Sequence, residues 1–271
     1  MARLNRAAVL AIAGRDVRIV ARSRGVLLPV IVVPAVLLLT PPLTLLTVRS
    51  APESLVSALA PLLTRLPADL LADLPEAPAR QAVLLLLVHV FAPLYLLVPV
   101  LVASVTAADT VVGERERGTL EGLLHSPTTD RDLLVAKLLT PWGAAVVIAT
   151  LGAIAYGAVA NLVLSGYGMA PAFPNLTWAV LVGWVSPAAA GLGVGLIVAA
   201  SVRITSFHQA SQMIGIVVLP IVALVVAQVA GLLLLGVVLL VLLGAALWLV
   251  TLLLLRIARR SFRRDRLLSR D

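Results

Sequence analysis

Apolar residues along this chain occur in long uninterrupted runs, not at the alternating spacing of half-buried helices or strands. A helix needs about 20 apolar residues, at ~1.5 Å rise each, to cross a hydrocarbon core of ~30 Å. Six runs without Asp, Glu, Lys or Arg reach that length. They cover residues 26–48, 82–106, 138–164, 178–200, 210–229 and 232–255. The pattern predicts an all-α integral membrane protein with about six transmembrane helices within residues 26–255.

The last two predicted spans form one apolar stretch that is about twice the length of a single span. We divide it near Gln228 to Gly231, because glycine permits a tight turn. Prolines inside the spans each remove a helix hydrogen bond, which a neighbouring helix or a hydroxyl group is expected to replace. Gly191, Gly193 and Gly195 predict close packing of the fourth span against its neighbours.

The N-terminal segment, residues 1–25, has the pattern of an amphipathic helix. Arg15, Arg18 and Arg22 recur at i, i+3 and i+7, and we expect the stretch to offer Val9, Ile12, Ile19 and Val20 to lipid. The pattern predicts an interfacial helix that lies on the inner leaflet.

A second amphipathic pattern lies between the first two predicted spans, in residues 49–81. Its leucines recur at steps of three and four, at Leu55, Leu59, Leu62, Leu66, Leu70 and Leu74. Prolines interrupt the pattern, so it predicts short amphipathic helices and not a folded domain. We expect this segment to lie on the outer membrane surface or to cap an exit path.

The charged residues predict the orientation of the chain. If the spans alternate and the N-terminus is cytoplasmic, 18 of the 21 Lys and Arg residues face the cytoplasm. The positive-inside rule therefore places both termini in the cytoplasm, with residues 256–271 as a basic cytoplasmic tail. The chain has a net charge of +8, and its basic residues flank the apolar runs. This placement indicates contact with the lipid bilayer and no nucleic acid partner.

Several kinds of chemistry are excluded by what the chain lacks. It has no cysteine, so it has no disulfide or thiolate site, and its three histidines form no i, i+4 metal pair. Lys137 is the only lysine and follows Val135 and Ala136, so the chain has no Gly-rich phosphate-binding loop. We predict no catalytic residue and no metal site. A gradient-driven carrier is disfavoured, because the predicted spans lack ionisable residues.

The richest charge cluster in the chain lies between the second and third predicted spans, in a loop assigned to residues 107–137. Its sequence from Asp109 to Pro127 contains Glu-Arg-Glu, then Gly-Thr-Leu-Glu, and then Leu-Leu before a proline. In this order the chain resembles ABC-2 type permeases, the transmembrane subunits of ABC exporters, whose loop is followed by a lysine at the position of Lys137. The Arg-rich N-terminal helix and the six spans extend the resemblance over the whole chain.

The resemblance implies that this loop forms a cytoplasmic coupling helix, which contacts a separate ABC ATPase subunit. The candidate coupling residues are Glu114, Arg115, Glu116, Gly118, Thr119, Leu120, Glu121, Leu123, Leu124 and Pro127. ATP and Mg²⁺ would be bound by the partner ATPase, so this chain would need no cofactor and would not be an enzyme. The other implied partner is a second permease copy or a homologous permease, in the cell (inner) membrane of a prokaryote. The substrate class stays open among drug-like amphiphiles, lipids or glycans, peptides and ions.

The residues of this loop are compatible with docking. Leu120, Leu123 and Leu124 form one apolar stripe at i, i+3 and i+4. Glu114, Glu116 and Glu121 would hold the loop against basic residues of the partner, of the loop itself or of the N-terminal helix. Thr129 is expected to cap the next helix, with Asp130 and Asp132 in its first turn.

Two other functions remain as alternatives to an exporter subunit. One is a membrane scaffold or mechanotransmission subunit that passes ATPase-driven motion to a partner without carrying substrate. The other is the gradient-driven carrier, which the apolar spans disfavour.

Overall fold

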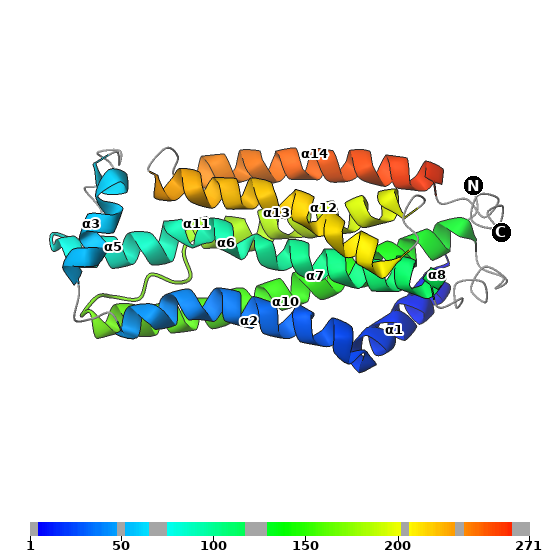
Figure 1. The fold of residues 1–271 in the computed structure, drawn as a ribbon, viewed down its shortest axis with the longest axis horizontal. Helices are drawn as coiled ribbons and strands as arrows, with labels where there is room; N and C mark the ends of the chain where they lie inside the picture. The colour runs from blue at the N-terminus through cyan, green and yellow to red at the C-terminus, as the bar shows by residue number, and fades with distance from the viewer. Residues whose placement is uncertain are drawn as a thin grey trace.

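Six long helices lie along the long axis of the structure (Figure 1). The computed structural model describes residues 5–47, 52–64, 75–116, 129–201, 206–230 and 236–261, and these ranges contain no β-strand. The helices long and apolar enough to span a membrane are Gly25–Leu46, Pro78–Gly113, Asp132–Gly166, Leu176–Ala200, His208–Val229 and Val237–Ile257. The prediction of an all-α integral membrane protein with six spans is confirmed.

Two of the spans are built from several consecutive helical segments. The second span comprises α5 (Pro78–Leu85), η2 (Leu86–Val90), α6 (Ala92–Tyr95), α7 (Leu97–Ala107), η3 (Ala108–Gly113) and α8 (Glu114–Glu116). The fourth comprises α11 (Leu176–Val180), η4 (Leu181–Val185) and α12 (Ser186–Ala200). The segments labelled η are π-helical turns, which insert an extra residue into an otherwise α-helical path.

The remaining spans are single helices. They are α2 (Arg24–Thr47), α10 (Asp130–Gly166), α13 (Phe207–Val229) and α14 (Val237–Ser261). The helical path of the last apolar stretch ends at Val229 and resumes at Val237. The predicted division near Gln228 to Gly231 therefore agrees with the end of α13.

The helices of the second and third spans extend further than the apolar runs predicted. α10 has 37 residues, so it is about 55 Å long and exceeds the full bilayer thickness of about 40–45 Å. Residues 107–116 and 130–137 of the expected loop are helical, and residues 117–128 lie outside the described residues. The longer helices include Asp109, Asp132 and Lys137, so the expectation that the spans hold no ionisable residue is wrong for their ends.

The N-terminal helix α1 (Arg6–Arg22) meets α2 at Ser23, whose φ of −85° and ψ of 101° are extended. Figure 1 shows the resulting bend between α1 and α2. α1 packs against α10 and buries Val9 and Ile12. The expectation that these two side chains face lipid is wrong, because they contact protein. Leu10 and Val17 are the large apolar side chains of α1 that are exposed.

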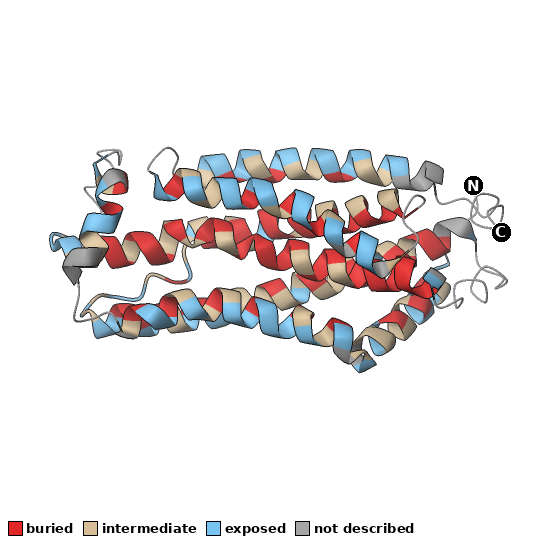
Figure 2. Cartoon of the chain, viewed as in Figure 1, coloured by how far each residue is buried: buried red, intermediate tan, exposed pale blue. Residues whose placement is uncertain are grey.

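The second and fourth spans form the centre of the bundle. Their most apolar windows are 78% and 61% buried, whereas no other span exceeds 28%. Figure 2 shows the buried residues concentrated along α5 to α7 and α12, with exposed residues along α2, α13 and α14. The outer four spans therefore present most of the surface that faces lipid, and the central two are the most extensively packed.

Close approach of the central helices depends on glycine. A Cβ added at Gly191 would lie 2.7 Å from Cγ2 of Thr251 on α14, and one at Gly195 would lie 3.1 Å from Cβ of Leu254. On another face of α12, a Cβ at Gly193 would lie 2.7 Å from Oγ of Ser104 on α7. The predicted close packing of the fourth span is confirmed, and it holds α12 between two neighbours.

The π-helical turn η2 exposes backbone carbonyls that three other spans satisfy. The Tyr156 hydroxyl donates to the Leu87 carbonyl at 2.7 Å, and the Trp178 indole Nε1 donates to the Val88 carbonyl at 2.9 Å. The Gln228 amide donates to the His89 carbonyl at 2.8 Å. His89 lies four residues before Pro93, whose missing N–H leaves that carbonyl without its helical donor. The predicted replacement of a proline-broken hydrogen bond is confirmed here.

The segment between the first two spans contains α3 (Pro52–Leu63), which lies across the end of the bundle opposite α1 (Figure 1). α3 packs against α5 and α13 through its buried Leu59 and Leu62. Leu66, Leu70 and Leu74 of the predicted amphipathic segment lie outside the described residues. The two ends of the bundle are called below the α1 end and the α3 end.

Candidate functional site

The candidate coupling residues begin where the second span ends. Glu114, Arg115 and Glu116 form the short helix α8, which continues η3 without a break. Glu114 is buried and Glu116 is exposed. The other candidates lie outside the described residues: Gly118, Thr119, Leu120, Glu121, Leu123, Leu124 and Pro127. Their role in coupling stays a prediction.

Glu114 belongs to a buried cluster of opposite charges at the α1 end. The Lys137 ammonium of α10 donates to Oε2 of Glu114 at 2.6 Å and to Oδ2 of Asp16 at 2.9 Å. Lys137 and Asp16 are 0% exposed and Glu114 is 2% exposed. We call Asp16, Glu114 and Lys137 the ionic cluster. It joins α1, α8 and α10, which are separated by up to 121 positions in the sequence.

A second cation brings the charges near the cluster into balance. Nη1 of Arg15 lies 3.7 Å from Oε1 of Glu114, and the Arg15 side chain is 41% exposed. Two carboxylates thus face one buried ammonium and one partly solvated guanidinium. Because removing one member of a buried pair costs roughly 3–5 kcal/mol, the three buried charges depend on one another, whereas the Arg15 pair is screened by solvent. Arg15 also shows that Glu114 is held by a basic residue of the N-terminal helix, one of the partners that the sequence allowed.

The start of α10 is attached to α1 by a separate set of hydrogen bonds. The Thr129 hydroxyl donates to Oδ2 of Asp132 at 2.7 Å, and the Asp132 backbone N–H donates to Oγ1 of Thr129 at 3.2 Å. The predicted N-cap at Thr129 is therefore confirmed. Oδ1 of Asp132 accepts the backbone N–H of Asn5 at 3.1 Å. Asn5 in turn caps α1.

These contacts place the segment 117–128 between two points that are fixed to the same helix. Glu114, just before the segment, is joined to α1 through Lys137 and Asp16. Asp132, just after it, accepts a hydrogen bond from the backbone N–H of Asn5, the N-cap residue of α1.

Sequence reasoning identified Glu114 and Lys137 but missed Asp16. The sequence contained a signal for this residue. Asp16 lies seven positions after Val9 and four after Ile12, on the buried face of α1. An acidic residue in register with the apolar positions of an otherwise Arg-rich helix indicates a buried cation as its partner. The only lysine of the chain supplies that cation.

Lys137 lies near the α1 end of α10 and not midway along it. It is 29 positions before Gly166, the last residue of α10, which corresponds to about 44 Å of helix against a hydrocarbon core of about 30 Å. The ionic cluster is therefore shielded by protein at one end of the bundle. It gives no support to an ion site midway across the membrane.

The described residues contain no group of three His, Asp or Glu side chains that could hold a metal ion. The binding of ATP and Mg²⁺ by a partner protein stays a prediction.

Comparison with known proteins is consistent with this architecture. The sequence profile of the family described as ABC-2 family transporter protein matches residues 10–244, most of the chain. The match begins within α1 and includes the ionic cluster and the first five spans. No curated protein matches the chain.

Proposed function

Because the chain belongs to the ABC-2 transporter family, we propose that it is the membrane-spanning permease subunit of an ATP-driven exporter. A separate ATPase subunit contacts residues 117–128, and a second permease copy or a homologous permease completes the translocation path. The observation that carries this proposal is the attachment of both ends of that segment to α1, through the ionic cluster and through Asp132.

The proposed coupling works through short and buried contacts. Movement of the docked segment displaces Glu114. The hydrogen bond of 2.6 Å between Glu114 and the Lys137 ammonium transmits this displacement to α10. α8 and α10 therefore move with α1 as one unit. Since α8 continues into η3 and α7, the displacement reaches the central second span and the helices packed around it.

The proposal places the α1 end in the cytoplasm, because 18 of the 21 Lys and Arg residues belong to that side. Ala7 and Ala170 are exposed at opposite ends, and the chain has no native cysteine. Ala170→Cys should react with a membrane-impermeant maleimide added to intact cells, and Ala7→Cys should react only after lysis. Labelling of Ala7→Cys in intact cells would reverse the orientation and contradict the proposal.

Coupling can be tested without knowing the substrate. We would purify the permease with its ATPase subunit and place a reporter, Ala58→Cys, on the exposed face of α3 at the opposite end. ATP with vanadate should change the maleimide labelling rate of this reporter. Glu114→Gln should reduce that change while the subunits remain associated and ATP is still hydrolysed. The matched control is Glu76→Gln, which alters an exposed carboxylate at the α3 end.

The result separates the exporter from the two alternatives. If the reporter responds to nucleotide equally in Glu114→Gln and in the parent, the ionic cluster does not carry the coupling. A reporter that responds to an imposed proton gradient and not to ATP would support a gradient-driven carrier. Nucleotide-driven motion without movement of any solute in reconstituted vesicles would support a mechanotransmission subunit.

A further inference from the structure

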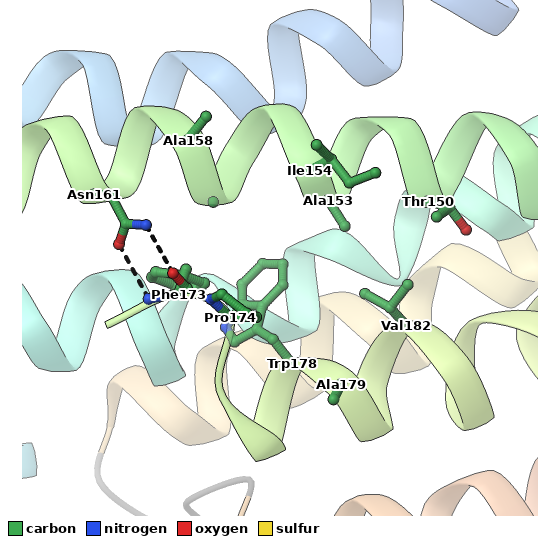
Figure 3. A pocket seen from close by; sticks show the side chains of 11 residues that line it. Thr150, Ala153, Ile154, Ala158, Asn161, Phe173, Pro174, Trp178, Ala179 and Val182 are labelled. Atoms are coloured by element: carbon green, nitrogen blue, oxygen red, sulfur yellow. Dashed lines mark hydrogen bonds between the residues drawn. The ribbon is translucent and has the colours of Figure 1, made fainter. Parts of the chain in front are cut away.

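A groove lies between the third and fourth spans towards the α3 end. It has a volume of about 410 Å³, within the range of about 300–1,000 Å³ that small-molecule sites occupy. Its lining includes Thr150, Ala153, Ile154, Asn161, Trp178 and Val182. Figure 3 shows Thr150 and Ala153 directed from α10 towards α11 and η4, with Val182 directed back towards them.

The polar side chains that line the groove each make hydrogen bonds within the protein. The Thr150 hydroxyl donates to the Val146 carbonyl, and the Trp178 indole donates to the Val88 carbonyl. The Asn161 amide accepts the N–H groups of Ala172 and Phe173 and donates to the Phe173 carbonyl (Figure 3). A ligand therefore meets mostly aliphatic surface and aromatic rings, so the groove favours an apolar chain.

The groove is continuous with the surface that faces the bilayer. Ile154 on its rim is 64% exposed, and Leu162 and Leu176 beside it are 60% and 66% exposed. Asn161 and the polar turn around Asn175 stand at its α3 end, where α11 begins. From Asn161 to Thr150 the wall on α10 is about 16 Å long, which matches the depth of one leaflet, about 15 Å.

We propose that this groove binds one acyl chain of a phospholipid in the leaflet at the α3 end. The chain enters sideways from the bilayer, runs along Ala153 and Gly157, and ends near Thr150. Ala153 is the small side chain on α10 that lines this path. Gly157 allows Phe173 to pack closely against α10, because a Cβ there would lie 3.3 Å from the Phe173 Cβ. The site does not depend on the proposed coupling to an ATPase.

In this position the Trp178 side chain would lie between the acyl chain and η2. Trp178, which lines the groove, stacks on Tyr156 with ring centroids 4.4 Å apart. These two side chains donate to the carbonyls of Leu87 and Val88 in η2. Chain occupancy therefore supports the aromatic contacts that hold the irregular turn of the central span.

Brominated acyl chains provide a direct test, because bromine quenches indole fluorescence on contact. The probe is phosphatidylcholine with bromine at mid-chain, in nanodiscs that contain a variant whose only tryptophan is Trp178, made with Trp142→Phe, Trp184→Phe and Trp248→Phe. Trp178 should be quenched, and adding Ala153→Phe to fill the groove should abolish the quenching. The matched control is Leu162→Phe, which adds the same ring at an exposed position of α10 outside the groove lining.

A second measurement keeps all four tryptophans, in case the single-tryptophan variant does not fold. Phosphatidylcholine with a photoreactive acyl chain should form adducts that map to residues 150–182, and Ala153→Phe should remove them. Replacing the headgroup by phosphatidylglycerol should leave both signals unchanged, because only the chain is bound. Three results would overturn the proposal: no quenching or adduct in the parent, as when a second protein covers the groove; signals that persist in Ala153→Phe; or signals that depend on the headgroup.

Discussion

The two ends of the central second span are attached to their neighbours by different chemistry. At the α1 end, Glu114 and Lys137 are joined through formal charges that are fully paired only when all three helices are in place. Near the α3 end, the carbonyls of η2 accept hydrogen bonds from the neutral side chains of Tyr156, Trp178 and Gln228. The second span is therefore held by ion pairs at one end and by hydrogen bonds from neutral side chains near the other.

This difference has an energetic consequence. Removing one charge from a buried cluster leaves its partners without compensation, whereas removing one neutral donor leaves a single carbonyl unsatisfied. The α1 end should therefore respond to a single substitution more strongly than the η2 end does. The substitutions below test that ranking, each by the midpoint of thermal unfolding in nanodiscs and by urea or detergent unfolding of the purified chain.

The largest effect is expected for Lys137→Met, which leaves Asp16 and Glu114 buried and facing each other. We expect a loss of about 3–5 kcal/mol in the free energy of unfolding. The combined variant Asp16→Asn, Glu114→Gln and Lys137→Met removes all three charges and should recover much of the loss. Arg18→Met, on the exposed face of α1, is the control and should be nearly neutral. A parent-like midpoint for Lys137→Met would show that the cluster does not hold the helices together.

A smaller effect is expected for Trp178→Phe at the η2 end. The substitution keeps an aromatic ring but leaves the Val88 carbonyl without its donor, at a cost of about 1–3 kcal/mol. Trp184→Phe is the matched control, because Trp184 donates to the Val241 carbonyl at 3.2 Å but is 42% exposed. If both variants lose the same stability, burial of the η2 carbonyl has no special role.

Gln228→Met should cost less than Trp178→Phe. It removes the donor to the His89 carbonyl, but it also removes Oε1 of Gln228, which is buried and accepts no hydrogen bond within the described residues. The two changes oppose each other, so we expect a net loss below about 1 kcal/mol. A loss equal to that of Trp178→Phe would show that the proline-broken hydrogen bond dominates this end.

The smallest effect is expected for Arg15→Gln at the α1 end. Its side chain is 41% exposed and its Nη1 lies 3.7 Å from Glu114, and a solvent-screened pair of this kind contributes about 0.2–1 kcal/mol. The loss should shrink further as the salt concentration rises. A large loss that is insensitive to salt would mean that Arg15 belongs to the ionic cluster and is not peripheral to it.

Much of this architecture follows from local sequence. The spans are predictable because a helix in lipid must satisfy its own backbone and present apolar side chains over a fixed length. The cap at Thr129 and the close packing at Gly191 are predictable for the same reason, since each depends on a few neighbouring residues or on the size of one side chain. The ends of the second and third helices were harder to predict, because paired charges allow a helix to continue past its apolar run.

The partners of the buried polar groups were decided only by the tertiary structure. The spans are apolar on almost every side, so no periodic pattern indicates which face meets which neighbour, and the packing register sets the pairs. That register brings Asp16 to Lys137 across 121 positions and Gln228 to His89 across 139. It also gathers Tyr95, Tyr156, Phe173 and Trp178 around η2, although aromatic residues are only 4% of the chain. Composition determines that the chain lies in a membrane, whereas packing determines which of its few polar groups and aromatic rings meet there.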